Sequence, residues 1–119
     1  MLSRSYPQAV AGAVEEYSFN SETGRFVMTY SLLSTLPASS LSFAATTEVF
    51  VNRELFYKQG LKVKVTGDQA SLLEVRCPVH GENVVQLVQK GDASDSGLSP
   101  SVRVTIDKCF SLLGETCTC

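Results

Sequence analysis

The sequence predicts an all-β protein, an antiparallel β-sandwich of about seven to eight strands that is immunoglobulin-like in the loose sense. Apolar and polar residues alternate in several separate segments, and clusters of turn-forming residues lie between these segments. No segment shows a convincing 3.6-residue helical repeat. The 119 residues suit one domain, whereas a (β/α)8 barrel typically needs about 250 residues.

Four segments alternate with the period of two that is typical of a strand with one buried face. They are residues 25–33, 61–66, 72–77 and 102–106. Their apolar positions predict a core made of Phe26, Met28, Tyr30, Leu32, Leu61, Val63, Val65, Leu73, Val75, Cys77, Val102, Val104 and Ile106. In this interpretation Cys77 is a small buried hydrophobic residue.

Three less regular segments complete the predicted strands, namely residues 14–20, 43–51 and 84–89. Tyr17 and Phe19 share one face of the first of them. Turn-forming residues follow the strands at 21–24, 67–70 and 78–83, and residues 91–100 have the composition of a long exposed loop. Residues 52–58 predict one helical turn at most. The chain has no tryptophan, so the Cys…Trp…Cys signature of immunoglobulin domains is absent.

Composition argues against several classes of function. The net charge is −2, from 10 basic and 12 acidic residues, so no basic surplus favours nucleic acid as a partner. The least charged stretch, residues 31–47, is too rich in serine for a transmembrane segment. Residues 9–12 imitate a signal-cleavage site, but polar residues occupy the place of the apolar core that should precede it. We therefore expect no full-length secreted precursor, although a mature or excised piece stays open.

The four cysteines are Cys77, Cys109, Cys117 and Cys119, and three connectivities exist if all are paired. Three of them lie in the last eleven residues, which is a poor distribution for a disulfide framework, and no Asn-x-Ser/Thr sequon is present. We expect reduced thiols and a frayed C-terminal tail. The compartment stays unknown, with a slight preference for an intracellular or reducing one.

A resemblance to a known family begins in the first residues. Residues 4–12 (RSYPQAVAG) and 17–20 (YSFN) resemble the opening of the C-terminal domain of endoglycoceramidase-like family 5 glycoside hydrolases. Residues 22–26 (ETGRF) are similar to the family's acidic-Thr-x-x-Phe pattern, and residues 47–51 (TEVFV) to one of its strands. The likeness covers about residues 4–90, departs from the family after Val51, and does not extend to the last thirty residues.

The resemblance implies a division of the chain and a function. Residues 1–13 would be an extended lead-in from a catalytic (β/α)8 barrel, 14–108 the sandwich, and 109–119 a C-terminal tail. The expected function is that of a non-catalytic accessory domain, which packs on the barrel and stabilises or orients it. The parent protein would hydrolyse glycolipids. We expect the interface with the barrel to include Arg4, Tyr6, Pro7 and Gln8.

No residue of the chain is expected to be catalytic. Retaining glycosidases use two carboxyl groups about 5 Å apart, and in the family these belong to the barrel. Glu48 and Glu54 are the nearest pair of note here, and we interpret both as solvated. Nucleotide-binding glycine motifs are absent, and Cys77 with His80 lacks the surroundings of a nucleophile and its base.

Two alternatives stay open at this point. In the first, the chain is an independent module that binds carbohydrate or glycolipid, a lipid surface or a protein. For glycan, a possible platform is made of Phe50, Phe56 and Tyr57. In the second, minor one, it is a small zinc domain whose ligands are Cys77, His80, Cys117 and Cys119. Because the spacing of these ligands is loose, our prediction is that the chain binds neither metal nor cofactor.

Overall fold

The computed structural model describes residues 6–10, 12–20, 22–33, 46–52, 57, 60–77, 83–91, 93 and 99–119. These residues form eight strands: β1 (Tyr6–Ala9), β2 (Ala13–Asn20), β3 (Arg25–Ser31), β4 (Thr46–Phe50), β5 (Leu61–Thr66), β6 (Leu73–Arg76), β7 (Val84–Gln89) and β8 (Ser101–Lys108). Two 3-10 turns complete the described elements, η2 (Ala70–Leu72) and η3 (Ser111–Leu113). Within this part of the chain, no helix is long and apolar enough to cross a membrane.

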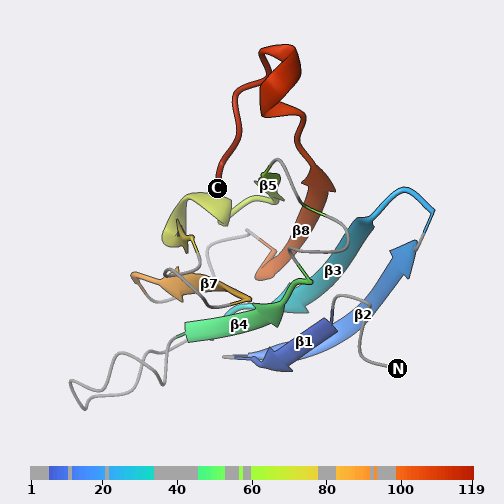
Figure 1. Cartoon of the computed structure of the whole chain (residues 1–119). Helices are drawn as coiled ribbons and strands as arrows, with labels where there is room; N and C mark the ends of the chain where they lie inside the picture. The colour runs from blue at the N-terminus through green and yellow to red at the C-terminus, as the bar shows by residue number, and fades with distance from the viewer. Residues whose placement is uncertain are drawn as a thin grey trace.

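The strands form two four-stranded sheets (Figure 1). Sheet A has the order β1-β4-β7-β6, and sheet B has the order β2-β3-β8-β5. Every pairing is antiparallel. The predicted all-β sandwich is therefore confirmed.

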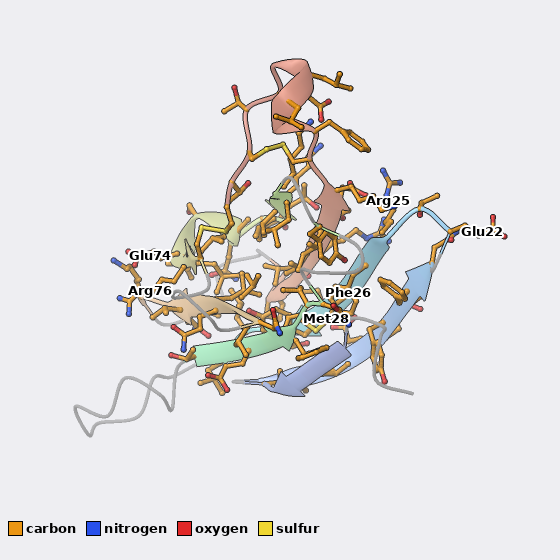
Figure 2. All side chains as sticks on the ribbon, in the orientation of Figure 1. Glu22, Arg25, Phe26, Met28, Glu74 and Arg76 are labelled. Carbon is orange, nitrogen blue, oxygen red and sulfur yellow. A yellow bond between two sulfur atoms is a disulfide. The ribbon has the colours of Figure 1, made fainter. Side chains whose placement is uncertain are left out.

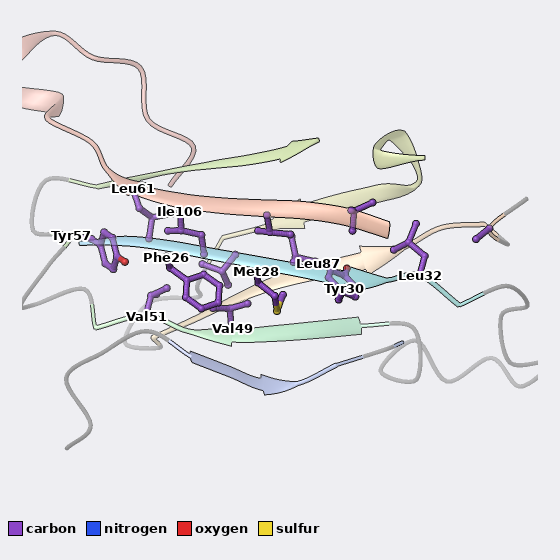
Figure 3. Packing of buried hydrophobic residues seen from close by; sticks show 14 residues of the cluster. Phe26, Met28, Tyr30, Leu32, Val49, Val51, Tyr57, Leu61, Leu87 and Ile106 are labelled. Atoms are coloured by element: carbon purple, nitrogen blue, oxygen red, sulfur yellow. The ribbon is translucent and has the colours of Figure 1, made fainter. Parts of the chain in front are cut away.

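The core lies between the two sheets and is centred on β3 (Figure 3). Phe26, Met28 and Tyr30 are completely buried, and so are the three alternate residues of the neighbouring strand β8. From sheet A they meet buried residues of β4 and β7, namely Val49, Val85 and Leu87. The alternation in residues 25–33 and 102–106 predicted these inward faces correctly, because a strand exposes every second side chain to the same side.

Two tyrosines within the core differ in how their hydroxyl groups are satisfied. The Tyr57 side chain is 2% exposed, and its hydroxyl donates a 2.7 Å hydrogen bond to the carbonyl oxygen of Gly24. The Tyr30 hydroxyl has no hydrogen-bond partner of regular geometry within the described residues. Burial raises the pKa of Tyr30 to about 12, and a lesser interaction with Thr47 acts in the opposite direction. Tyr57 therefore fixes a turn, whereas Tyr30 contributes chiefly its ring.

The segment expected to be a lead-in contributes a strand to the sandwich. β1 pairs with β4 at the edge of sheet A, with Tyr6 opposite Phe50 and Pro7 opposite Val49. An edge strand tolerates proline because one side of the strand needs no ladder hydrogen bonds. The structure thus places residues 6–9 within the sandwich, outside the 14–108 range expected for it.

Gly12 allows the chain to pass from sheet A to sheet B. Its φ is +132°, and a Cβ at this position would overlap the carbonyl oxygen of Ser31. Only glycine adopts this conformation without strain and lets the two backbones approach so closely. Gly12, the last residue of the opening motif, therefore has a structural reason.

The β2–β3 turn forms where the sequence predicts it. The Asn20 side-chain oxygen accepts hydrogen bonds from the backbone N–H groups of Glu22 and Thr23. Gly24 then adopts a φ of +76° and donates to the Asn20 carbonyl at 2.7 Å. Asparagine and glycine are typical of such turns for these two reasons.

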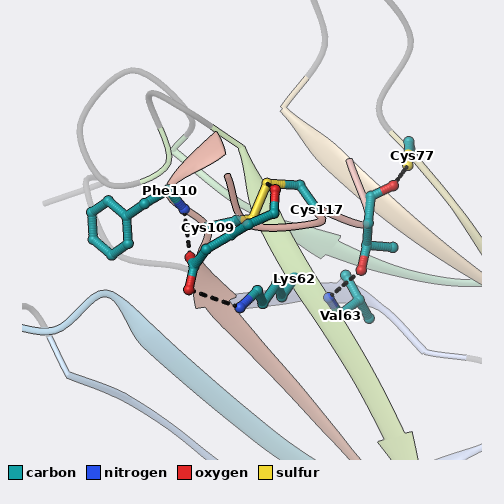
Figure 4. The surroundings of a disulfide bond; sticks show 8 residues. Lys62, Val63, Cys77, Cys109, Phe110 and Cys117 are labelled. Atoms are coloured by element: carbon teal, nitrogen blue, oxygen red, sulfur yellow. Dashed lines mark hydrogen bonds and ion pairs between the residues drawn. A yellow bond between two sulfur atoms is a disulfide. The ribbon is translucent and has the colours of Figure 1, made fainter. Parts of the chain in front are cut away.

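The C-terminal tail is part of the fold, so the prediction of a frayed tail with reduced thiols is wrong. Cys77 forms a disulfide with Cys119. Cys109 forms one with Cys117 (Figure 4). The last residues also pair with the start of β5, since Leu61 N–H donates to Cys119 O and Thr118 N–H to Leu61 O. Disulfides persist in oxidising environments, so the argument for a reducing compartment no longer holds.

The interpretation of Cys77 as a buried hydrophobic residue is also wrong. Cys77 follows β6, the edge strand of sheet A, and it is exposed. Cys119 lies beside β5, the edge strand of sheet B. The Cys77–Cys119 disulfide therefore joins the two sheets at one side of the sandwich.

We expect the two buried tyrosines to respond differently to loss of the hydroxyl group. Tyr57→Phe should lower the free energy of unfolding by about 1–3 kcal/mol, because the buried Gly24 carbonyl loses its donor. Tyr30→Phe should change it by less than about 0.5 kcal/mol or raise it, since no regular hydrogen bond is lost. Denaturant titration of both variants tests this, and equal losses would contradict it.

The disulfide that joins the sheets should stabilise the protein more than the local one. The Cys77–Cys119 bond closes a separation of 42 residues and the Cys109–Cys117 bond one of 8. The chain-entropy model gives about 4 kcal/mol for the first and about 2.5 kcal/mol for the second. Paired Cys→Ser variants, compared by denaturant titration, measure the two contributions. Free thiols in the denatured, unreduced wild type would contradict the disulfides themselves.

Candidate functional site

Sheet A presents an apolar end on its outer face, next to the expected domain interface. Phe50 alternates with the buried Val49 and Val51, as predicted, and is half-buried on the outer side. Register pairs Phe50 with Val84 on one side and with Tyr6 on the other. Tyr6, a predicted interface residue, and Phe50, a predicted platform residue, are therefore neighbours in one cross-strand row.

Of the other predicted interface residues, Pro7 is half-buried, and Gln8 belongs to β1 by its backbone. Arg4 lies outside the described residues. Contact of these residues with a catalytic domain stays a prediction.

Farther along the same face, polar groups surround Val88, and their side chains are paired (Figure 2). Glu74 pairs with Arg76 at 2.8 Å and also with Lys90. Gln86 donates a 3.2 Å hydrogen bond to Glu48, which is the residue expected to be solvated and is half-exposed. Hydrogen bonds within the protein thus already occupy these groups.

The aromatic platform predicted for glycan binding does not form as expected. Tyr57 is 2% exposed and belongs to the core, so its assignment to an exposed platform is wrong. Phe56 lies outside the described residues. Phe50 is thus the one predicted platform residue that the structure places on a surface. One half-buried ring offers much less stacking area than a row of aromatic side chains.

An apolar surface that the sequence analysis did not identify lies along the edge strand β2. Val14 pairs with Tyr30 and Tyr17 pairs with Met28, so both point to the inner face of sheet B. They are nevertheless 40% and 52% exposed. Tyr17 covers one flank of Phe26, with ring centroids 6.2 Å apart, and its remaining surface is open to solvent.

A bulge explains why these two residues share a face although they are three positions apart. The register shifts between Val14 and Glu16, which inserts one extra residue into β2. Glu15 then lies on the outer face, where it accepts hydrogen bonds from Ser31 and Ser101. Alternation in the sequence alone could not reveal this shift, because a bulge breaks the period of two.

Three described carboxyl groups have lowered pKa values, because hydrogen bonds and ion pairs within the fold stabilise their ionised forms. The pKa of Glu15 is lowered by hydrogen bonds from Ser101 and Ser31. The pKa of Glu74 is lowered chiefly by Lys90 and Arg76, and that of Glu115 by the Phe110 N–H group and Lys62. A glycosidase acid needs the opposite shift, towards a raised pKa. Glu54 lies outside the described residues.

A shallow open hollow lies beside the β2–β3 turn. It is lined by Ser18, Phe19, Asn20, Glu22, Arg25 and Val27. Its main polar groups serve the fold, since Asn20 holds the turn and Arg25 pairs with Asp107 at 2.8 Å. We therefore see no preformed polar constellation for a sugar in it.

The zinc alternative is contradicted by the pairing of the cysteines. Zinc requires thiolates, whereas Cys77, Cys117 and Cys119 are all in disulfides. His80 lies outside the described residues. Among the residues that the structure describes, no group of three or more His, Cys, Asp or Glu side chains is arranged for a metal ion.

Comparison with known structures shows where this fold occurs. Three crystal structures of sterylglucosidase 1 from Cryptococcus neoformans match with TM-scores of 0.59, 0.60 and 0.56, at 14%, 12% and 15% sequence identity. Each match covers 88% of this chain and only 13% or 14% of the sterylglucosidase chain. At this identity the likeness shows the fold alone. No curated protein sequence matches the chain.

Sequence comparison with protein families gives a more specific result. The model of the glycoside hydrolase family 5 C-terminal domain matches residues 4–106. The match includes all eight strands up to Ile106 of β8, and it includes the opening motif that carried the resemblance. The chain therefore belongs to the glycoside hydrolase family 5 C-terminal domain family.

Proposed function

We propose that this chain is a non-catalytic accessory domain that packs on the (β/α)8 barrel of a family 5 glycoside hydrolase and stabilises or orients it. The observation that carries this proposal is the family match over residues 4–106. The small share of the sterylglucosidase chains that the fold covers, 13% or 14%, supports a much larger parent.

The position of β1 supports docking at one particular side of the sandwich. β1 is the first element and forms the edge of sheet A, and β2 forms the edge of sheet B. A barrel that precedes the chain would thus be connected beside these two edges (Figure 1). Val14 and Tyr17 are exposed on β2 at this side. Covering them would remove apolar surface from water, which favours docking there.

We further propose that the parent acts on a glycolipid. Two observations support this: the resemblance of the opening motif to endoglycoceramidase-like enzymes, and the sterylglucosidase identity of the structural neighbours. The alternative of an independent glycan-binding module is weaker, because Tyr57 is buried and cannot present its ring.

The isolated chain should release no sugar from any glycosphingolipid or steryl glucoside. The physical reason is that the nucleophile and acid that hydrolysis requires would lie on the barrel. Incubation of the purified chain with these glycolipids, followed by chromatography of the products, measures this. Turnover that copurifies with the chain and is lost in Glu48→Gln would contradict the accessory role.

Tyr6 should matter more in the two-domain parent than in the isolated chain. We expect Tyr6→Ala to lower the free energy of unfolding by less than about 0.5 kcal/mol in the chain alone. In the parent it should cost about 2 kcal/mol, as for a side chain in a desolvated interface pocket. Denaturant titration of both proteins measures the difference.

Leu112→Ala is a suitable control for the Tyr6 experiment, because Leu112 is 84% exposed and belongs to η3, near the opposite end of the chain from β1. It should have little effect in either protein. Equal losses from Tyr6→Ala in the two proteins would place Tyr6 in the packing of the sandwich itself and remove the docking argument. Tyr17→Ala tests the β2 part of the same side by the same comparison.

A further inference from the structure

The C-terminal loop after β8 carries the two most exposed large apolar side chains among the described residues, Leu112 and Leu113, together with Phe110. Leu112 is 84% exposed, Leu113 is 79% exposed and Phe110 is 41% exposed. The loop projects beyond both sheets as a narrow finger (Figure 1). The family match ends at residue 106, so this finger lies outside the residues that the family model matches. Core formation does not explain it, because its apolar side chains point away from the core.

The fold holds this finger in one shape. The Cys109–Cys117 disulfide closes its base. Leu113 N–H donates to Phe110 O at 2.9 Å, and Phe110 N–H donates to the Glu115 carboxylate at 2.8 Å. The finger therefore presents its leucines with little further loss of conformational entropy. Internal hydrogen bonds also reduce the cost of moving its backbone out of water.

The tip of the finger is uncharged. Residues 110–114 contain no charged side chain. The acidic residue of the finger, Glu115, pairs with Lys62 at 3.3 Å at the base, and it accepts the Phe110 N–H group there (Figure 4). The charges nearest the tip, Glu115 and Lys62, thus neutralise each other, and residues 110–114 contain no basic cluster that would attract anionic headgroups.

The size and shape of the finger favour a lipid surface over a protein partner. Three side chains at a convex tip cannot bury the roughly 800 Å² per partner that a stable protein interface needs. Shallow insertion into a membrane needs only a few apolar side chains and no complementary groove. The finger also follows β8, away from the β1 and β2 edges proposed for the barrel.

We propose that the disulfide-closed finger, residues 109–117, is a membrane-binding tip that inserts Phe110, Leu112 and Leu113 into the surface of an electrically neutral lipid bilayer. This deepens the proposed function, on which the choice of a lipid surface partly rests. A parent that hydrolyses a glycolipid would be held by the finger at the surface where its substrate lies. Three side chains give weak, reversible binding, which suits an enzyme that moves between substrate molecules.

Cosedimentation of the 119-residue chain with phosphatidylcholine vesicles tests the proposal. The wild type should bind, and Leu112→Ser/Leu113→Ser should lower the partition coefficient at least about tenfold, because two leucines no longer leave water. Circular dichroism checks that the double variant stays folded. Val14→Ser is the matched control, an exposed apolar residue on β2 whose loss should leave binding unchanged.

A fluorescent reporter gives an independent measurement. The chain has no tryptophan, so Leu113→Trp introduces a single fluorophore at the tip. Its emission should shift to the blue on addition of vesicles, and Cys109→Ser/Cys117→Ser in the same background should weaken binding. Raising the salt concentration or adding phosphatidylserine should change binding little, since the tip is uncharged.

Several results would overturn the proposal. They are absence of vesicle binding by the wild type, equal binding by the double leucine variant, or binding that needs phosphatidylserine and disappears at high salt. Loss of a dimer in the double variant without vesicle binding would make the finger a contact between copies. These outcomes are independent of the barrel, because vesicle binding uses this chain alone. The proposed accessory role fails separately, if the parent has no barrel or if the barrel does not dock.

Discussion

Each sheet of this sandwich has one apolar face, and the burial of these two faces against each other is the contact on which the other features depend. β3 contributes the largest side chains to this contact, Phe26, Met28 and Tyr30, all completely buried. Burial of each such side chain contributes about 1.5–3 kcal/mol. Because β3 and β8 occupy the centre of sheet B, the turns, edges and tail can vary only in ways that keep these strands in register.

The two open sides of the sandwich differ in how far they are covered. On the β5 and β6 side, the Cys77–Cys119 disulfide links the end of β6 to the tail, and the tail pairs with Leu61 of β5. On the β1 and β2 side, the chain passes from sheet A to sheet B at Gly12, and Val14 and Tyr17 remain exposed. A closed side needs no partner, whereas exposed apolar groups beside the first strand are suited to a neighbouring domain.

The C-terminal extension combines a structural part and an exposed part within eleven residues. Cys119 is integrated into the sandwich through its disulfide and its backbone contacts with β5. Between β8 and that anchor, the Cys109–Cys117 bond separates a small loop whose leucines stay in water. Two disulfides in a short tail thus allow one segment to stabilise the fold while the other presents apolar side chains at a distance from the core.

The sequence by itself determined the fold class, the inward faces of β3 and β8, the β2–β3 turn and the family, because these depend on local periodicity, turn chemistry and a short motif. Tertiary structure alone decided the pairing of Cys77 with Cys119, the burial of Tyr57 beneath Gly24 and the shared face of Val14 and Tyr17. The first two depend on contacts between residues distant in sequence, and the third depends on a bulge. Neither kind of feature leaves a periodic pattern in the sequence. Pairing between strands and the closure of the sandwich bring such residues together, so their roles follow from the packed sheets and not from the order of the chain.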